Sequence, residues 1–320
     1  MTTFDDIGAV VIGRNEGDRL ITCIQSLLLQ LKTVIYVDSG STDDSVDKAT
    51  ALGATVVALD PNTPFTAARA RNAGLDALLD AGDFAFVQFV DGDCEVEPAW
   101  ITAARAFLDA HPAAVVVCGR RKERYPDATI YNRLIDAEWD TPIGKARACG
   151  GDALMRVTSL REVGGFNPNL IAGEEPELCV RLRAAGGEIY RIAHPMTIHD
   201  AALKRFGQWW RRNRRAGHAY AEGAALHGAP PEQHNVTETR RAVAWGVVLP
   251  ILSLIAVLLG GWALLLLVIW PLQVTRLNMR GMDWTRAFFL TLGKIPEGLG
   301  VLDYLWRRIR GRQPELIEYK

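Results

Sequence analysis

Two pairs of acidic residues have a spacing that suits chemistry. Asp91 and Asp93 flank a glycine directly after an apolar run, on an irregular turn where both carboxylates can point to the same side. Such a pair can bind a divalent cation, because ions like Mg²⁺ take one or two carboxylates together with substrate phosphates. Glu174 and Glu175 open a helical segment, and a carboxylate within reach of a substrate proton can act as a general base. Solvated acids on a turn and acids that complement a helix dipole are the alternatives.

The chain around these pairs alternates short β-rich runs with helical patterns, from residue 8 to about residue 195. This alternation predicts the α/β fold class, with a mainly parallel sheet and helices on both faces. The strand candidates are residues 9–12, 33–37, 54–58 and 84–89, and the helix candidates are residues 19–31, 44–52 and 66–81.

Ligands of such sheets bind beyond the carboxyl ends of the strands. The loop after the first strand, the end of the second strand and the turn after the fourth strand therefore contribute to one expected site. Their polar residues are Arg14, Glu16, Asp38, Asp91 and Asp93.

Charge divides the 320 residues into two regions, and this length predicts about two domains. Residues 1–203 carry 19 Lys and Arg against 29 Asp and Glu, whereas residues 204–320 carry 17 against 8. The second region is basic and also apolar, which favours contact with anionic lipid and disfavours nucleic-acid binding. The five cysteines are scattered and odd in number, and no apolar leader is visible at the N-terminus. We therefore expect the N-terminal domain in the reducing cytoplasm.

A membrane segment is predicted in residues 242–275, a run of 34 residues without a charge. One helix of that length would be about 51 Å long, whereas the hydrocarbon core is about 30 Å thick. Gly260 and Gly261 lie near the middle, so we expect a transmembrane helical hairpin with arms near residues 243–259 and 262–275. Arginines on both outer sides place both ends in the cytoplasm. A re-entrant pair and a buried soluble helical hairpin are the alternatives.

The expected domain boundaries follow from these patterns. Residues 1–225 form the globular domain, residues 226–241 a linker and residues 242–275 the hairpin. Residues 276–320 are partly apolar but interrupted by charges, and they include a basic tail up to Arg312. We expect an interfacial or third membrane helix followed by this tail. The protein would then reside in the inner (cytoplasmic) membrane of the cell.

Five short segments, in this order, resemble the family 2 glycosyltransferases of the GT-A fold. They are residues 10–16 (VVIGRNE), 35–43 (IYVDSGSTD), 69–74 (RARNAG), 90–93 (VDGD) and 173–182 (GEEPELCVRL). The resemblance covers roughly residues 7–200. It implies a Rossmann-like GT-A domain of a membrane-anchored bacterial enzyme. It also implies inverting transfer of a sugar from a nucleoside diphosphate sugar, in cell-envelope or exopolysaccharide synthesis.

The resemblance implies a metal site and a base. Asp93 matches a direct ligand of the divalent cofactor, Mg²⁺ or Mn²⁺, and Asp91 would face the ribose and the metal waters. His199 could complete the metal site, as a histidine near this point does in some GT-A enzymes. Glu175 matches the general base that acts on the acceptor hydroxyl, at a position where the family usually has Asp.

The resemblance also implies a donor site, in which Asp38 contacts the nucleoside and Asp152 the sugar hydroxyls. Asp38 could instead cap the turn that follows it, and Arg69 could take the role given to Arg71. At Arg14 the family often has an aromatic residue, but a guanidinium can also stack on a base. The expected nucleotide-sugar-binding residues are Arg14, Glu16, Asp38, Arg71, Asp91 and Asp152.

The acceptor is expected to be lipid-linked or a polysaccharide precursor, with Glu174, Gln208 and Arg211 as contacts for the acceptor or a phosphate. Processive relatives carry Q-x-x-R-W, and Arg212 in place of the tryptophan disfavours processive synthesis. The basic, aromatic residues 204–215 leave a polyprenyl phosphate acceptor open. A nucleotidyltransferase and an inactive membrane scaffold are further alternatives. The sequence has only a poor version of the glycine-rich phosphate-binding loop that a nucleotidyltransferase needs. The presence of Asp38, Asp91, Asp93 and Glu175 together disfavours an inactive scaffold.

Overall fold

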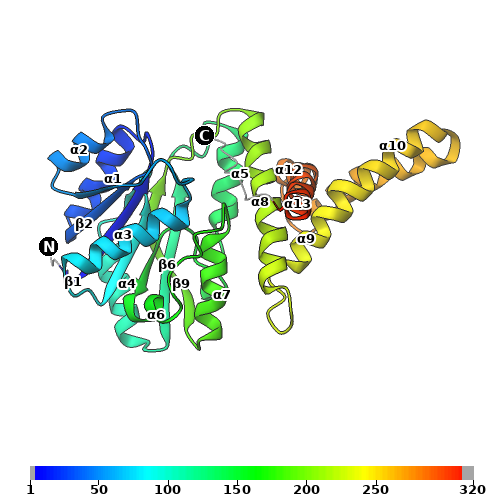
Figure 1. Cartoon of the computed structure of the whole chain (residues 1–320). Coiled ribbons are helices and arrows are strands. Elements are labelled where there is room, and N and C mark those ends of the chain that lie inside the picture. The colour runs from blue at the N-terminus through cyan, green and yellow to red at the C-terminus, as the bar shows by residue number, and fades with distance from the viewer. Residues whose placement is uncertain (1–3, 312–320) are drawn as a thin grey trace. The chain divides into compact units, whose positions relative to one another are not determined.

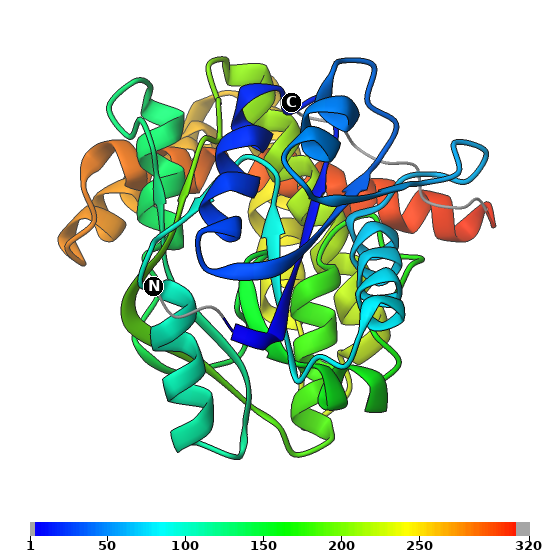
Figure 2. The same ribbon diagram turned by 90° about the vertical axis from the view of Figure 1, so that its left-hand side faces the viewer.

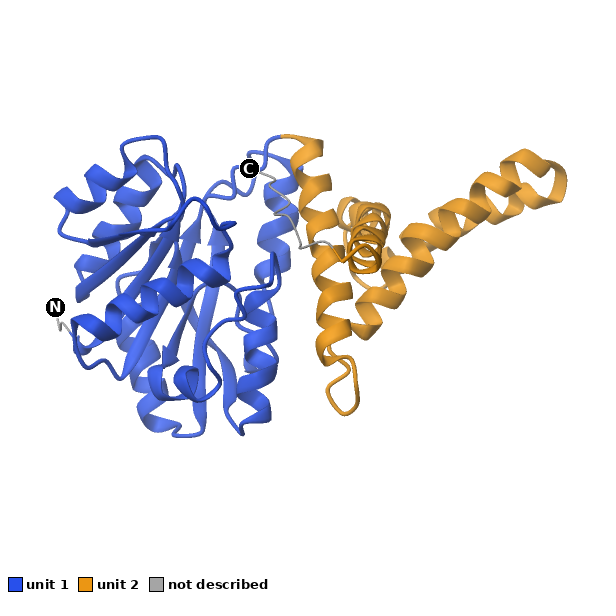
Figure 3. Cartoon of the chain, in the orientation of Figure 1, with its two compact units in different colours: residues 1–204 blue, residues 205–320 orange. Residues whose placement is uncertain are grey.

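The computed structural model describes residues 4–311, which divide into two compact units (Figure 3). The first unit comprises residues 1–204 and the second residues 205–320. Each unit has its own core of buried apolar side chains.

A nine-stranded sheet forms the centre of the first unit (Figure 1). Its strand order is β3-β2-β1-β4-β8-β6-β9-β5, and β7 pairs with β9. The strands are β1 (Phe4–Gly13), β2 (Leu31–Asp38), β3 (Thr55–Ala58), β4 (Phe86–Asp91), β5 (Cys94–Val96), β6 (Ala114–Glu123), β7 (Gly144–Ala146), β8 (Ala153–Arg156) and β9 (Glu188–His199).

The sheet is mixed, and its parallel part carries the strands that the sequence predicts. β3, β2, β1 and β4 pair in parallel, as do β6 and β9. β8 is antiparallel to β4 and β6, while β5 and β7 are antiparallel to β9. The α/β fold class is confirmed, and each of the four predicted strands coincides with one of β1 to β4. Strands buried on both faces read as continuous apolar runs, which explains why β1, β2 and β4 can be recognised in the sequence. β3 lies at the edge of the sheet and is partly exposed.

Helices lie against both faces of the sheet. In the edge-on view of Figure 2, α1 and α4 cover one face, while α3 and α7 cover the other. The predicted helix 19–31 is shorter than expected, because Leu31 already begins β2 and pairs with Phe4. The helices of this unit are α1 (Asp18–Leu28), α2 (Ser45–Ala51), α3 (Ala67–Ala81), α4 (Trp100–Ala110), α5 (Ile130–Trp139), α6 (Val157–Glu162) and α7 (Glu174–Ala184).

The close contact of α3 with the sheet depends on Gly74. A Cβ built on Gly74 would lie 2.3 Å from Cγ1 of Val10 and 2.9 Å from Cγ2 of Val37. Val10 and Val37 are buried side chains of β1 and β2. The glycine therefore lets the helix backbone approach the parallel strands whose ends carry the acidic residues.

The second unit is helical. Its elements are α8 (Phe206–His227), α9 (Val236–Val243), the π-helical η1 (Ala244–Val248), α10 (Leu249–Leu259), the 3-10 helix η2 (Gly261–Val268), α11 (Ile269–Met279), α12 (Trp284–Leu292) and α13 (Lys294–Ile309). α13 packs along α8 where Gly300 lies against the backbone carbonyl of Arg214. An ion pair between Arg214 and Asp303 (2.7 Å) joins the same two helices.

Two consecutive helices of the described chain are long and apolar enough to cross a membrane. They are Val236–Leu259, with 24 residues, and Gly261–Met279, with 19 residues. Between them Gly260 and Gly261 have φ angles of 65° and 55°, in the left-handed region that favours glycine. Leu258 and Trp262 next to this turn are 77% and 87% exposed. Apolar surface of this extent indicates contact with a membrane or a partner.

The division into units differs from the predicted boundary at residue 225. The described chain divides after Lys204, because α8 packs against α9 and α13 of the second unit. Lys294 and Glu297, two of the charges that interrupt the partly apolar residues 276–320, form an ion pair of 2.6 Å within α13. Of the predicted basic tail, Arg307 and Arg308 lie in the last turn of α13 and Arg310 directly follows it, whereas Arg312 lies outside the described residues.

Replacement of Gly74 tests the contact of α3 with the sheet. On an exposed helix Gly→Ala would stabilise by about 1 kcal/mol. Here we expect Gly74→Ala to destabilise the protein by about 1–3 kcal/mol, because the added methyl overpacks Val10. Urea unfolding measures the change, and Asp76→Ala on the exposed side of α3 is the matched control. A stabilising Gly74→Ala would contradict the described packing.

Candidate active site

Asp93 and His199 come together where β5 pairs with the end of β9. The antiparallel register places Cys94 opposite His199, which brings Asp93 next to the imidazole. Oδ1 of Asp93 lies 3.2 Å from Nε2 of His199. Asp93 is 4% exposed and His199 is 7% exposed, so both groups are withheld from bulk water.

Glu123 at the end of β6 supports the histidine from its other side. Oε2 of Glu123 lies 3.9 Å from Nδ1 of His199 and accepts a hydrogen bond from the backbone N–H of Ala201 (3.0 Å). The Trp139 ring contacts the imidazole edge-on, with centroids 4.7 Å apart. Burial alone would lower the pKa of His199, but the carboxylates of Asp93 and Glu123 outweigh it and raise the pKa above its usual value.

These side chains fit a divalent cation. One ligand atom each from Asp93, Cys94 and His199 lies within 4.8 Å of the others, and all three residues are buried. A carboxylate oxygen and an imidazole nitrogen suit ions such as Mn²⁺, while the Cys94 thiol already contacts Asp93 at 3.8 Å. Asp93 and His199 are therefore the residues that would hold the ion.

The Arg71 side chain ties the end of β4 to the start of α7. Its Nη2 lies 2.7 Å from Oδ1 of Asp91, and its Nη1 lies 2.6 Å from Oε1 of Glu174. Only 3% of Arg71 is exposed, so the two carboxylates compensate a buried positive charge. Arg71 thus positions two of the acids that the sequence singles out.

A second arginine joins the same network from β6. Nη2 of Arg121 lies 2.8 Å from Asp152 and 3.5 Å from Asp91. Burial would raise the pKa of Asp91, but the guanidiniums of Arg71 and Arg121 hold it below its usual value. Asp91 is therefore an anion that two cations orient.

Asp152 lies beneath this network with no exposed surface. Its Oδ1 accepts the backbone N–H of Asp91 (3.1 Å), and its Oδ2 accepts the hydroxyl of Thr197 (2.7 Å). A Cβ on the preceding Gly151 would lie 2.8 Å from Oδ2 of Asp91, so the glycine leaves room for that carboxylate. In the described chain, Asp152 binds protein groups, and its predicted contact with sugar hydroxyls stays a prediction.

Asp38 ends β2 and caps the turn that follows. Its Oδ2 accepts the backbone N–H groups of Gly40 (3.0 Å) and Ser41 (2.9 Å), and its Oδ1 accepts the hydroxyl of Tyr36 (2.9 Å). The capping role that the sequence leaves open is therefore present. Each carboxylate oxygen has two lone pairs, so a nucleoside contact is compatible with the cap.

Arg14 and Glu16 lie on the loop after β1. The Arg14 guanidinium is 5.8 Å from the centre of the Phe65 ring, which Arg69 approaches to 5.9 Å. Glu16 pairs with Arg19 at 2.7 Å. Arg69 also donates to the backbone carbonyls of Asp60 and Thr63, which ties it to its own loop and leaves the network of acids to Arg71.

Glu175 follows Glu174 on α7 but faces a different set of groups. Its Oε1 accepts the backbone N–H of Cys149 (2.6 Å) and lies 2.9 Å and 3.0 Å from the sulfurs of Cys149 and Cys179. Glu177 forms a two-pronged ion pair with Arg181 at 2.9 Å and 2.7 Å. The three acids of this turn therefore have three separate sets of partners.

Gln208 and Arg211 lie on α8 of the second unit. Oε1 of Gln208 accepts the backbone N–H of Arg205 (3.0 Å) and so caps the helix. Arg211 is exposed. Their predicted contact with an acceptor or a phosphate stays a prediction.

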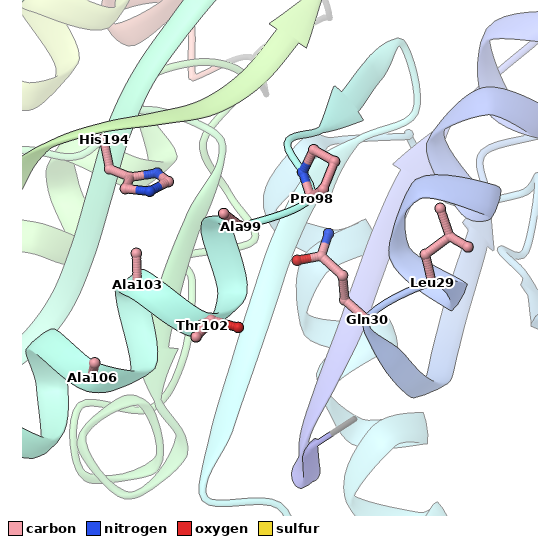
Figure 4. Close-up of a pocket in the computed structure, with 8 residues that line it drawn as sticks. All are labelled: Leu29, Gln30, Pro98, Ala99, Thr102, Ala103, Ala106 and His194. Atoms are coloured by element: carbon pink, nitrogen blue, oxygen red, sulfur yellow. The ribbon is translucent and has the colours of Figure 1, made fainter. Parts of the chain in front are cut away.

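A pocket of about 440 Å³ lies between the end of α1, the start of α4 and β9 (Figure 4). Leu29, Ala103 and His194 are among its lining residues, and the walls are mostly apolar. None of the acids described above lines it. The polar network at the carboxyl ends of the strands therefore remains the candidate active site.

Sequence reasoning misses Arg121, Glu123, Cys149 and Cys179 as residues of this site. The basic run 120–122 after the apolar start of β6, in an acidic domain, is a signal for Arg121. The strand pairing that brings Glu123 to His199 leaves no local signal.

Comparison with known proteins agrees with this fold. Residues 9–162 match the model of the family described as Glycosyl transferase family 2. A mannosyltransferase from Pyrobaculum calidifontis, in complex with GDP-Man and Mn²⁺, is similar with a TM-score of 0.66 and 19% identity, over 96% of this chain and 89% of that one. Glucosyl-3-phosphoglycerate synthase from Mycobacterium tuberculosis, in complex with Mn²⁺, UDP and glucosyl-3-phosphoglycerate, is similar with a TM-score of 0.52 and 20% identity, over 71% and 81% of the two chains. Curated protein sequences give no match.

The family match and the fold define the class, an enzyme with the GT-A fold that transfers glycosyl groups. Within that class, residues 9–162 belong to glycosyl transferase family 2.

Removal of the Arg71 charge tests the network. We expect Arg71→Leu to destabilise the protein at pH 7 by about 3–5 kcal/mol, because it leaves Asp91 and Glu174 without their buried partner. The low pKa of folded Asp91 stabilises the protein above the unfolded value of about 4, and this contribution is lost as pH falls. The difference between wild type and Arg71→Leu should therefore shrink below about pH 4.

Urea unfolding at pH 7 and at acidic pH measures both effects. Arg161→Leu, at an exposed position, is the control and should stay within about 0.5 kcal/mol of wild type. If Arg71→Leu lowers the free energy of unfolding by the same amount at both pH values, the pairing with Asp91 is not the cause of the destabilisation.

Proposed function

We propose that this protein is a membrane-anchored, metal-dependent glycosyltransferase that moves a sugar from a nucleoside diphosphate sugar to an acceptor hydroxyl with inversion. The observation that carries this proposal is the approach of Asp93 to His199 (3.2 Å) beside the Asp91–Arg71–Glu174 network. A cation site next to fixed carboxylates at the carboxyl ends of strands suits a donor with a diphosphate.

Mg²⁺ or Mn²⁺ is the proposed cofactor, and the mannosyltransferase and the synthase named above are structures with Mn²⁺. Asp93 and His199 would hold the ion. When bound, the ion compensates the negative charge of the leaving diphosphate. The Glu123 carboxylate lies 3.9 Å from Nδ1 on the other side of the His199 ring.

The donor nucleoside would lie along the ends of β1 and β2. Asp38 is fixed there by the hydroxyl of Tyr36 and two backbone N–H groups, so the remaining lone pair on Oδ1 points in a set direction. The Arg14 guanidinium near the Phe65 ring offers a flat cationic surface for a base. Asp91, held by two arginines, would accept from the ribose.

Glu175 is the proposed general base. Its Oε1 is occupied by the backbone N–H of Cys149 and by two thiols, which fixes the plane of the carboxylate. Oε2 then remains as the oxygen that would take the proton of the acceptor hydroxyl. One base is sufficient for a single displacement, which inverts the anomeric centre.

The acceptor would be a lipid-linked sugar or a polysaccharide precursor of the cell envelope. A polyprenyl phosphate is the second candidate, because α8 begins with a basic and aromatic segment in which Arg211 is exposed. Such an acceptor is already an anion and needs charge compensation, whereas a hydroxyl needs a base. This difference separates the two acceptor classes.

The helices Val236–Leu259 and Gly261–Met279 would anchor the enzyme in the inner membrane as a hairpin. Arginines precede and follow the uncharged run, which favours both ends on the cytoplasmic side. The glycosyltransferase domain would then face the cytoplasm.

Replacement of Asp93 tests the metal site. We expect Asp93→Ala to lose Mn²⁺-dependent donor turnover and the Mn²⁺-induced rise in melting temperature, while the protein still folds. The loss follows from removing one of the two side chains that would hold the ion. The control is Asp83→Ala, at an exposed position. Near-normal turnover by a folded Asp93→Ala protein would contradict the metal assignment.

Replacement of Glu175 tests the base and separates the acceptor classes. For a hydroxyl acceptor, Glu175→Gln should lower transfer by about 10²–10⁴-fold while the affinity for the sugar nucleotide is retained. Initial rates and a donor-binding titration measure the two quantities, with the exposed Glu162→Gln as control. If Glu175→Gln keeps most of its transfer rate, the base assignment is wrong and a phosphate acceptor becomes the better account.

Cysteine labelling tests the hairpin. Cysteines introduced at Glu238 and Asn278, near the outer ends of the two apolar helices and outside the uncharged run 242–275, should react with an impermeant reagent from the same side of the membrane. The flanking arginines are the reason for this expectation. Reaction from opposite sides would mean an odd number of crossings between these positions.

A further inference from the structure

Three ligand atoms of different type converge beside the candidate base. Sγ of Cys149, Sγ of Cys179 and a carboxylate oxygen of Glu175 all lie within 4.8 Å of one another. The two sulfurs are 3.8 Å apart, and Oε1 of Glu175 is 2.9 Å from one and 3.0 Å from the other. The roles proposed above for the metal cofactor and the donor use neither thiol.

We propose that Cys149, Cys179 and Glu175 form a second metal site, selective for a thiophilic divalent cation of the Zn²⁺ type. Zinc binds thiolate sulfur at about 2.3 Å in tetrahedral geometry, so two thiolates on one ion lie about 3.8 Å apart. That is the separation of the two sulfurs here. The carboxylate completes a three-ligand set and leaves a fourth position for water, as in open zinc sites.

The backbone holds these ligands in place. Glu175 and Cys179 are one turn apart on α7, so their side chains lie on the same side of the helix. Cys149 lies in the loop between β7 and β8, and its backbone N–H donates to Oε1 of Glu175. The backbone carbonyl of Arg147 accepts from Arg183 of α7, which fastens the loop to the helix. The carboxylate would need to withdraw by about half an ångström to reach ligand distance.

Access and burial suit a bound ion. Glu175 is 5% exposed and Cys179 is fully buried, while Cys149 is partly exposed and provides a route from solvent. On binding, each S–H bond is replaced by a sulfur–metal bond, and the two protons leave to the buffer. Two thiolates and one carboxylate then surround a doubly charged cation, which leaves one net negative charge at the site.

The ligand types separate this site from the one at Asp93 and His199. Thiolates select soft or borderline ions such as Zn²⁺, whereas Mg²⁺ and Mn²⁺ prefer oxygen. The two sites can therefore hold different ions in the same molecule. This inference rests on the proposed function only in its consequence for activity, because a metal on Oε1 would withdraw electron density from Glu175 and weaken it as a base.

Binding of Co²⁺ and Zn²⁺ to the full chain under a thiol-free reductant tests the site directly. We expect one tightly bound ion per chain and thiolate-to-cobalt charge-transfer absorption, which added Zn²⁺ abolishes. Cys149→Ser and Cys179→Ser should each lose that absorption. They should also weaken Zn²⁺ binding by more than the about 10–100-fold that loss of an outer-shell partner causes.

Cys23→Ser removes a buried thiol outside the cluster and is the control, with absorption and affinity like those of wild type. The absence of a charge-transfer band in the folded wild-type protein would overturn the proposal. So would a band that persists unchanged in both cluster variants.

The rate of glycosyl transfer in excess Mn²⁺, with and without Zn²⁺, provides a second test. We expect Zn²⁺ to inhibit transfer by the wild type, and this inhibition to disappear in Cys149→Ser when each rate is compared with the zinc-free rate of the same variant. Zinc that binds with the thiolate signature but leaves transfer unchanged would support the site and overturn the role of Glu175 as base. The failure of the inference and the failure of the proposed function are thus distinguishable.

Discussion

The buried guanidinium of Arg71 is the contact on which the rest of the candidate site depends. It is 3% exposed and pairs with Asp91 and Glu174 at 2.7 Å and 2.6 Å. A charge so far from water is tolerated only with good partners, and the carboxylates in turn need the cation. The end of β4, α3 and the start of α7 are therefore held in one arrangement. Asp93 lies two residues after Asp91, and Glu175 directly follows Glu174. The position of both residues therefore depends on the two carboxylates that Arg71 holds.

Much of this arrangement can be predicted from the sequence, because buried strands have a recognisable apolar pattern. β1, β2 and β4 are mostly buried strands with apolar runs, and residues at their carboxyl ends meet at one edge of a parallel sheet. The proximity of Asp38, Asp91 and Asp93 is expected from their position at these carboxyl ends alone. The approach of His199 to Asp93 has a different origin, because it requires the register of β5 on β9. No local pattern encodes that register, and only the family resemblance points to the histidine.

The structure also shows where residue type alone is ambiguous. Asp38 ends β2 and Asp152 precedes β8 in an acidic domain, yet both carboxylates accept hydrogen bonds from the protein itself. The cysteines are scattered along the sequence, but the loop before β8 brings Cys149 to within 3.8 Å of Cys179. Both outcomes depend on how loops return to the sheet, and loop paths are set by tertiary contacts.

The late position of β9 in the chain has a consequence for biosynthesis. β9 pairs with β5, β6 and β7, so that half of the sheet keeps open edges until residues 188–199 have been translated. The first long apolar helix begins at Val236. At about 5–20 residues per second, the ribosome needs roughly 2–7 s to extend the nascent chain from His199 to that helix. During this interval every strand of the sheet has been synthesised while the two long apolar helices have not, so translation order favours closure of the sheet before these helices are made.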